Sequence, residues 1–529
     1  MNAAGQAELR IFWGDSHHNL FVSESDDVDM EHVCRSARAH LDFMTMAYYT
    51  PRLFPYKPEL NPPGTRGFRL EEWKPAEQIE REWQTVQKAS RRHNETGRFV
   101  TFPGYEWQGD GRSGDHNVVY REEGLPVFRV ETLAELYECL RTHAAIAIPH
   151  HTAYRTGCRG KDWSVHDEQL SPFAEIFSVH GCSEADEDWV GMWRNHHMGP
   201  SVAGGTYRDA LLRGLHVGAI CSGDSFGAGM LTGTYGNGLM AVLAPELTRA
   251  ALWDAFRARR VYGVTGDRIE LAFTINGAPM GACISGTGPR TIRVAVKGLD
   301  AIDRIEVLRD ERVLVTRNHQ GTWCSPAPCA RGRFVLRLEA GWGPTDEELE
   351  VGDHQWQGTL ELTDGRFVRA VPCWRSHGQT PAELSGRTAT FSMCSSPHDA
   401  AGRWHNANVF EFEADPASRL HLCLNGREVR ASVAELMDGS RLLWYHDECV
   451  ELLRALRGLT PQECRRDDTY YHMAYKAKLH RVMPAAAYTA TYEFEDDEPL
   501  AHDACYRVRV EQRNGQRAWS SPIWVQCIK

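Results

Sequence analysis

The sequence predicts a two-part α/β protein with a parallel sheet or barrel in its first half and a β-rich second half. Three observations support this. Short apolar runs alternate with amphipathic helical stretches from residue 11 to about 265. Beyond about residue 268 the helical pattern fades, and the chain shows alternating β-branched residues separated by Gly and Asn-Gly turns. A chain of 529 residues also exceeds what one hydrophobic core usually organises. We therefore expect a metal-binding α/β part over 1–268 and a sandwich-like region over 269–529, built as one or two modules.

Each element of the first half follows from hydrophobic periodicity, and at least six strand–helix units fit. The expected strands are 11–14, 41–47, 98–107, 144–149, 174–181 and 216–224, and the expected helices are 30–40, 75–93, 132–143, 207–215 and 246–260. In the second half, a helix over 435–456 is expected to interrupt the strands. A closing hairpin is expected to turn at Asn514-Gly515.

Composition excludes several classes of protein. The net charge of -12 and a pI near 6.1 argue against nucleic-acid binding, which needs a basic field. Neither an 18-residue apolar run nor a signal-peptide pattern is present, so we expect no membrane span and no export. The fifteen cysteines lack paired zinc-site spacing and are expected to be free thiols in the cytoplasm. We expect a small-molecule partner, and homo-oligomerisation stays open.

Nearly every expected strand of the first half ends in residues that can bind a metal ion. Loops at the carboxyl ends of parallel strands converge on one face, so such residues need not be near in sequence. Imidazole and carboxylate together suit Zn²⁺ or Mn²⁺, which lower the pKa of bound water from about 15.7 towards about 7. Attack by metal-activated water is therefore the expected reaction class. The residues at strand ends are Asp15, His17, His18, Asn19, Glu106, His116, His150, His151, His180 and Asp224.

Other roles compete with metal binding at these positions. A lone histidine such as His180 is more often a packing residue than a ligand. The carboxylate of Glu106, in the apolar phrase FPGYEW, needs a partner, which is either a metal ion or a buried arginine. Asp224 in CSGDSFGAG could instead cap a turn. The groupings of His17 with Asp15 and of His150 with His151 favour the metal-site interpretation.

The chain contains the motifs GDSHHN (14–19), LDFMTMAYY (41–49), GRFVTFPGYEW (97–107), GDHNVVY (114–120), IPHHTAY (148–154), CSGDSFGAG (221–229), RARRVYGVTGDRI (257–269) and AWSSPIWV (518–525). These motifs resemble the PHP (polymerase and histidinol phosphatase) superfamily, and more closely a branch of it classed as a domain of unknown function. The resemblance implies a distorted (β/α)₇ barrel, up to three metal ions, and hydrolysis of phosphate esters.

The resemblance also assigns ligand positions, and four of them hold residues that bind metals poorly. These four are Asn19, Tyr48, Tyr49 and Phe226. The matching positions that remain are His17, Glu106, His116, His150 or His151, and Asp224. Asp15 is expected to add a ligand or to orient His17. We therefore expect one or two divalent ions, Mn or Zn with Fe as a further candidate, in place of three.

These residues predict a metal-dependent hydrolase acting on a small, anionic substrate, which is a phosphoester, amide, lactone or ester. Arg155, Arg159 and Lys161 follow the histidine pair and are either anion-binding residues or surface charges. The candidate general acid or base is His180 or the member of the His150/His151 pair that does not bind metal, here taken as His151.

Aromatic residues are expected to complete the substrate site. Tyr48 and Tyr49 are candidate donors to a developing oxyanion, and with Phe226 they are expected to wall an aromatic pocket. The alternative is a catalytically degenerate protein that recognises a partner through its β-sandwich.

Overall fold

The structure, a computed structural model, describes most of the chain, in thirteen stretches. They are 8–22, 27–50, 74–188, 190–192, 199–226, 237–286, 288–321, 330–343, 351–373, 379–395, 405–460, 462–463 and 474–528. The chain divides into two compact units, of which the first is 1–297, 303–318 and 491–529, and the second is 298–302 and 319–490. The first unit thus extends beyond residue 268 and takes in the end of the chain.

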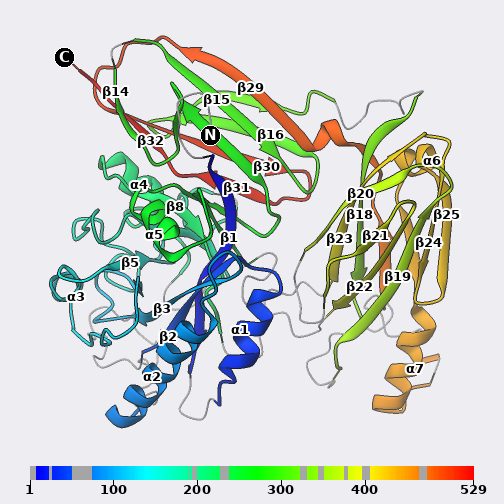
Figure 1. Ribbon diagram of the computed structural model, residues 1–529, viewed down its shortest axis with the longest axis horizontal. Helices are drawn as coiled ribbons and strands as arrows, with labels where there is room; N and C mark the ends of the chain where they lie inside the picture. Colours follow the sequence, from blue (N-terminus) through cyan, green and yellow to red (C-terminus); the bar gives the residue numbers. More distant parts are fainter. Residues whose placement is uncertain are drawn as a thin grey trace. The chain divides into compact units, whose positions relative to one another are not determined.

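The first unit begins with strands and helices that alternate along the chain. Up to residue 268 these are β1 (Arg10–Leu20), α1 (Met30–Arg38), β2 (Phe43–Tyr49), α2 (Ala76–His93), β3 (Val100–Trp107), β4 (His116–Tyr120), α3 (Leu133–Leu140), β5 (Ala145–Pro149), β6 (Phe173–Ser178), β7 (Gly181–Cys182), α4 (Tyr207–Leu212), β8 (Gly218–Cys221), β9 (Ser225–Phe226), β10 (Leu239–Ala244), α5 (Arg249–Arg257) and β11 (Val261–Val264). Strands β1, β2 and β3 lie side by side, and α1 and α2 pack against β2 (Figure 1). The expected α/β character of this half is confirmed.

Within the described residues, the hydrogen-bonded ladders do not close into a barrel. The central strands of a 14-stranded sheet run in the order β11-β10-β1-β2-β3-β4-β5, and β6 and β8 belong to a separate sheet with β7. Strand β5 lies beside β6, and β8 lies beside β11. A (β/α)₇ repeat requires parallel neighbours, but β4 runs antiparallel to β3 and β5, and β10 runs antiparallel to β1 and β11. The ladders establish a mixed α/β, sheet-rich fold.

An apolar core covers one face of the central strands and helix α5. Because side chains alternate between the two faces of a strand, the core residues lie two positions apart in the strands β3, β5 and β10, which contribute more than one. Helix α5 contributes Leu252, Trp253 and Phe256. The strands contribute Phe12, Phe43, Val100, Phe102, Val119, Ile146, Ile148, Phe173, Ile220, Met240 and Val242.

Later strands complete the first unit. They are β12 (Glu270–Ile275), β13 (Ala278–Pro279), β14 (Cys283–Ser285), β15 (Arg290–Lys297), β16 (Ile302–Arg309), β17 (Arg312–Asn318), β29 (Thr489–Asp496), β30 (Ala504–Gln512), β31 (Arg517–Ser520) and β32 (Ile523–Gln526). Strands β30 and β31 form the hairpin predicted at Asn514-Gly515. Strand β31 also pairs with β11, and Trp519 packs in a core with Phe177 and Tyr207.

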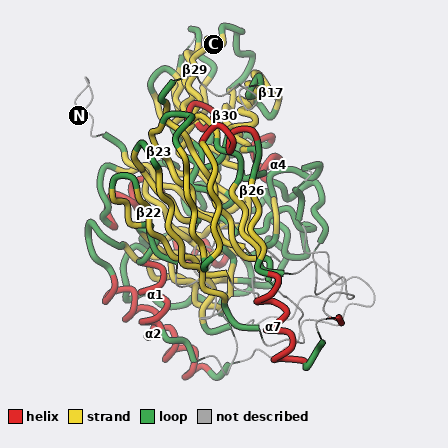
Figure 2. Tube along the Cα trace, turned by 90° about the vertical axis from the view of Figure 1, so that its right-hand side faces the viewer, coloured by secondary structure: helices red, strands yellow, loops and turns green. Residues whose placement is uncertain are grey.

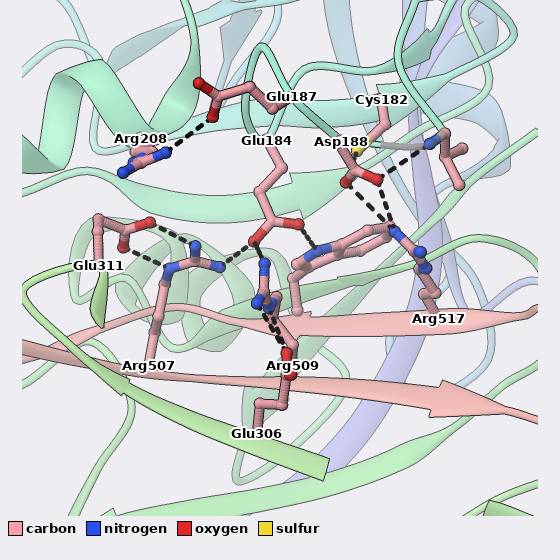
Figure 3. A network of polar contacts seen from close by, with 12 residues as sticks. Cys182, Glu184, Glu187, Asp188, Arg208, Glu306, Glu311, Arg507, Arg509 and Arg517 are labelled. Carbon is pink, nitrogen blue, oxygen red and sulfur yellow. Dashed lines mark hydrogen bonds and ion pairs between the residues drawn. The ribbon is translucent and has the colours of Figure 1, made fainter. Parts of the chain in front are cut away.

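Glu184, which is fully buried, centres a network of ion pairs that joins these late strands to the early part of the unit (Figure 3). Its carboxylate accepts hydrogen bonds from Arg507 Nη1 (2.5 Å), Arg509 Nη1 (3.3 Å) and Trp519 Nε1 (2.6 Å). Both oxygens of Glu311 accept from Arg507 (2.7 and 2.6 Å). Burial disfavours the charge of Glu184, but Arg507 and Arg509 outweigh it and hold the pKa of this carboxyl below its ordinary value.

The second unit is β-rich, with two sheets and a core that includes Trp356, Phe391 and Phe410. Its elements are β18 (Gly332–Gly341), β19 (His354–Leu362), β20 (Arg366–Pro372), β21 (Glu383–Ser385), β22 (Thr388–Ser395), β23 (His405–Ala414), β24 (Arg419–Leu424), β25 (Arg427–Ser432), α6 (Val433–Asp438), β26 (Arg441–Trp444), α7 (His446–Arg457), β27 (Lys476–Leu479), β28 (Met483–Pro484) and the 3-10 helix η4 (Ala485–Tyr488). Figure 2 shows strands of this unit, among them β22, β23 and β26. The helix predicted over 435–456 is wrong as a single element, because β26 separates α6 from α7.

Candidate metal centre

The proposed ligands share one face of the sheet with the apolar core. In β3, Val100 and Phe102 are core residues, and Glu106 lies four residues further along the same face. In β5, Ile148 is a core residue, and His150 takes the next position on that face. The polar cluster therefore starts where the core ends, at the C-terminal ends of these strands.

His17 lies at the centre of the cluster. Its Nε2 is 3.4 Å from Glu106 Oε2 and 3.3 Å from Asp224 Oδ1, and its Nδ1 is 2.9 Å from Glu175 Oε2. Glu175, in β6, also accepts a hydrogen bond from Ser222 Oγ (2.5 Å). When Nδ1–H donates to Glu175, the lone pair of Nε2 faces Glu106 and Asp224. Histidines that bind metals are commonly oriented in this way by a carboxylate on the other nitrogen.

His151, His180 and Asp224 form an adjoining group. His180 Nε2 is 3.0 Å from Asp224 Oδ2, and His180 Nδ1 is 2.8 Å from the hydroxyl of Tyr154. The rings of His151 and His180 have centroids 4.8 Å apart. One oxygen of Asp224 faces His17 and the other faces His180, so this carboxylate lies between the two groups.

Asp115 and Arg159 bring further charges to the cluster. Arg159 donates through Nε and Nη2 to Asp115, and its Nη2 lies 3.8 Å from Glu106 Oε1. His151 Nε2 is 3.5 Å from Asp115 Oδ2. Burial raises the pKa of Asp115, but Arg159 and His151 outweigh this effect and hold it below its ordinary value. The buried arginine considered as a partner for Glu106 is thus present beside the candidate ligands.

Three residues of the cluster have left-handed backbone conformations. The φ angles are 35° at His151, 67° at Arg159 and 47° at Asp224. Residues other than glycine seldom adopt such angles, and strain of this kind gathers at functional sites. Consecutive residues of a regular strand point to opposite faces. Because the backbone turns left-handed at His151, His150 and His151 both reach the cluster, with ring centroids 4.4 Å apart.

Burial and neighbouring charges set the protonation of the cluster. Burial lowers the pKa of His17, but Asp224 and other carboxylates outweigh it and hold this pKa well above its ordinary value. Burial, with His17 and His151, lowers the pKa of His150 well below its ordinary value. Burial opposes the charge of Asp224, yet its histidine neighbours hold its pKa well below the ordinary value. His150 is therefore neutral at pH 7, which is the form of imidazole that binds metals.

Several buried atoms of the cluster have no hydrogen-bond partner within the described residues. They are both ring nitrogens of His150, Nδ1 of His151, Oε1 of Glu175 and Oδ1 of Asp115. Leaving a buried polar group without a hydrogen-bond partner lowers stability by about 1–3 kcal/mol. We therefore expect a bound ion or molecule to contact these atoms. Imidazole nitrogens and carboxylate oxygens fit a divalent ion such as Zn²⁺ or Mn²⁺. Donor atoms lie within 4.8 Å of one another in the groups His17/Glu106/His150, Asp115/His150/His151, His151/His180/Asp224 and His17/Glu175/Asp224.

His116 was predicted to be a ligand, and Asp15 to be either a ligand or a residue that orients His17, but both side chains take other positions. Asp15 Oδ1 accepts the backbone N–H groups of His17 and Gly223, at 2.9 Å each, and so holds the two ligand-bearing segments together. His116 lies on the face of β4 opposite to that of Asp115, because adjacent strand residues alternate. Its Nδ1 is 3.1 Å from the carbonyl oxygen of Gly114. Neither residue belongs to the groups of potential ligands named above.

The two tyrosines predicted to contact substrate lie on opposite faces of β2. The hydroxyl of Tyr48 donates to Glu82 of α2 (3.0 Å), behind the sheet. Tyr49 pairs in register with Glu106 of β3 and shares its face. The structure therefore brings Tyr49, but not Tyr48, to the side of the cluster.

The remaining predicted substrate contacts are dispersed. Arg155 is exposed, whereas Lys161 is fully buried and donates to the carbonyl oxygen of Val165 (2.8 Å). Burial lowers the pKa of Lys161 to about 7. The backbone of Phe226 pairs with that of Asn19, and the side chain of Phe226 lies outside the described residues.

Two carboxylates of the cluster were missed from sequence. Glu175 is the single acidic residue within the apolar strand FAEIFS, a signal that it is buried and partnered. Asp115 directly precedes His116, and strand alternation could have shown that only one of these neighbours faces the core side. Tyr154, which orients His180, gave no local signal.

Comparisons with known proteins point to relatives without an assigned function. A family model described as "Protein of unknown function (DUF3604)" matches residues 56–174 and 204–278. Uncharacterized proteins of Chlamydia pneumoniae and Chlamydia trachomatis are 27% identical over 254 residues and 28% identical over 258 residues. These matches cover 44% and 45% of this chain, and 40% and 41% of the relatives. The chain thus spans less than half the length of the curated relatives that it matches.

A solved structure from Bacteroides vulgatus, of a two-domain protein containing a predicted PHP-like metal-dependent phosphoesterase, is 10% identical with a TM-score of 0.31. The match covers 73% of this chain and 87% of the chain from Bacteroides vulgatus. Within the described residues, no helix combines the length and apolar character that a membrane crossing requires. The chain is similar to a family of unknown function, as the sequence phrases indicated.

Proposed function

We propose that this protein is a metal-dependent hydrolase that acts on a small, anionic substrate with one or two divalent ions. The observation that carries the proposal is the convergence of buried histidines and carboxylates on one face, where several donor atoms have no hydrogen-bond partner among the described residues. All of these residues precede residue 268, as proposed for the metal-binding part. The residues that would hold the ions are His17, Glu106, His150, His151, His180 and Asp224.

The chain's own side chains have distinct roles in this proposal. A divalent ion held here supplies a Lewis acid and lowers the pKa of water. Glu175 keeps Nε2 of His17 facing the ion, because it accepts the hydrogen bond from Nδ1. Arg159, fixed by Asp115, provides a positive charge that favours an anionic substrate. Tyr49 lies on the same face as Glu106 and is a donor to an oxyanion.

We include in the proposal a PHP-like arrangement, in which the central strands curve around the core as a distorted barrel. Support comes from the neighbours at the two breaks in the ladders, where β5 lies beside β6 and β8 lies beside β11. The parallel pairing of β1 with β2 and of β2 with β3 is a second support. A crystal structure with bound metal tests this arrangement.

A metal-reconstituted sample, screened in parallel against phosphoesters, lactones and amides, tests the reaction. His17→Gln should remove the activity and the bound metal. His116→Gln is the matched control, because His116 is equally buried but lies on the opposite face. Equal activity in the two variants would contradict a role of His17 in the reaction. A wild-type protein that binds no metal would favour the alternative role in binding or regulation.

A further inference from the structure

Asn19 lies inside the cluster. From the sequence, it was expected to bind metal poorly at a position where the resemblance assigns a ligand. Its side chain is fully buried at the end of β1. Its Nδ2 is 3.3 Å from His17 Nε2 and also 3.3 Å from Asp224 Oδ1. Within the described residues, the other amide atom, Oδ1, is buried and has no hydrogen-bond partner. The amide thus faces the two ligand atoms while its acceptor is unused.

A bound cation reverses the preferred orientation of this amide. The lone pairs of His17 Nε2 and Asp224 Oδ1 then belong to the cation, and the partial positive charge of the amide N–H₂ faces it unfavourably. A half-turn of the terminal amide exchanges its nitrogen and oxygen without moving the backbone. The unused acceptor of Asn19 then occupies the place beside His17 and Asp224. Amide carbonyl oxygens are ligands for hard cations.

We propose that Asn19 is a metal ligand through Oδ1 and that it makes this position favour Mn²⁺ over Zn²⁺. The inference rests on the proposed metal-dependent function and specifies its metal. With Asn19, the set formed with His17, Glu106, His150 and Asp224 has three oxygen donors and two nitrogen donors. Carboxylate and carbonyl oxygens suit Mn²⁺, whereas additional imidazole favours Zn²⁺. The residue at position 19 therefore sets the preference between these two ions.

The test is calorimetric titration of metal-free protein with Mn²⁺ and, separately, with Zn²⁺. The proteins compared are the wild type, Asn19→Leu, Asn19→Asp and Asn19→His. The control is Asn94→Leu, which changes an asparagine at the end of α2. Leucine matches asparagine in size but has no donor atom, so we expect Mn²⁺ to bind at least about 10-fold more weakly. Asn19→Asp should bind Mn²⁺ more tightly. Asn19→His should shift the ratio of affinities towards Zn²⁺ by at least about 10-fold.

Each outcome decides between the proposals. Unchanged Mn²⁺ binding in Asn19→Leu, in a protein with native circular dichroism, overturns the role of Asn19 and leaves the proposed function standing. If Asn19→Leu does not fold, the ratio of affinities in Asn19→His decides, and a wild-type ratio overturns the proposal. A wild-type protein that binds neither ion contradicts the proposed function as well. Asn94→Leu should match the wild type for both ions.

Discussion

Two clusters of buried charge in the first unit differ in how completely their members are paired. The carboxylate of Glu184 is met by Arg507, Arg509 and Trp519, and Arg507 is met again by Glu311 (Figure 3). The cluster around His17 has carboxylates and imidazoles with buried atoms that lack hydrogen-bond partners in the described residues. A complete set of partners is typical of a structural network, whereas an incomplete one is typical of a binding site.

Proximity of ligand-type residues alone does not separate these two clusters. Cys182, Glu184 and Asp188 also have donor atoms within 4.8 Å of one another. However, both oxygens of Asp188 accept from Arg517, at 3.1 and 3.2 Å, and Glu184 already has its arginine partners. A cation would have to displace these guanidinium groups. The pairing of the carboxylates therefore argues for a structural role here.

The largest expected effect is a loss of stability when the network around Glu184 is broken. Glu184→Gln removes the negative charge that faces Arg507 in a buried position. We expect a loss of about 3 kcal/mol in the free energy of unfolding, because Arg507 and Arg509 each lose one of their two carboxylate partners. Urea unfolding measures this loss. Metal bound per folded molecule should stay at the wild-type level, and a change below about 1 kcal/mol would contradict the structural role.

In the cluster around His17, a substitution should lower metal affinity and leave stability unchanged. Glu106→Gln removes a proposed ligand, so we expect metal affinity to fall by about 100-fold. The metal-free protein should keep its stability, because one buried charge has been removed. Glu82→Gln is the matched control, since Glu82 is a buried carboxylate that binds Lys74 outside the cluster. Loss of stability without loss of metal in Glu106→Gln would assign this residue to the fold.

The stability contributed by Glu184 should depend on pH. The pKa of Glu184 is held below its ordinary value of 4.5 in the folded protein. Its stabilising contribution is therefore present above pH 4.5 and is lost as the pH falls through the folded pKa. Denaturant unfolding between pH 7 and pH 3 should show a smaller loss of stability in Glu184→Gln than in the wild type. Parallel curves for the two proteins would contradict this assignment.

The smallest expected effect concerns a residue that the sequence placed in the site. Tyr48→Phe removes one hydrogen bond to Glu82, which keeps its bonds from Lys74 and Gln78. We expect a loss of about 1 kcal/mol in stability and no change in metal affinity or activity. Tyr49→Phe is the comparison on the opposite face, where activity should fall while stability is kept. Loss of activity in Tyr48→Phe alone would reverse this assignment.

Local patterns in the sequence determined much of this protein. The alternation of apolar runs and amphipathic stretches predicted the helices α1 to α5 and the strands β1, β2, β3, β5, β6 and β8, with helix α2 expected over 75–93 and found at Ala76–His93. It did not predict β4, β7, β9, β10 or β11. The turn residues Asn514-Gly515 predicted the hairpin of β30 and β31. Most members of the cluster were named from sequence because their imidazole and carboxylate side chains lie at or just beyond the ends of buried strands. These features depend on residues close together in the chain.

Only the tertiary structure decided which of these side chains meet. His116 and Asp115 are neighbours in sequence, yet strand pairing directs only Asp115 towards His151. Glu175 reaches His17 from 158 residues away, and Arg507 returns to Glu184 across 323 residues. The physical reason is that sheet register and backbone strain, such as the left-handed turn at His151, depend on the partners of a strand, which its own residues do not specify.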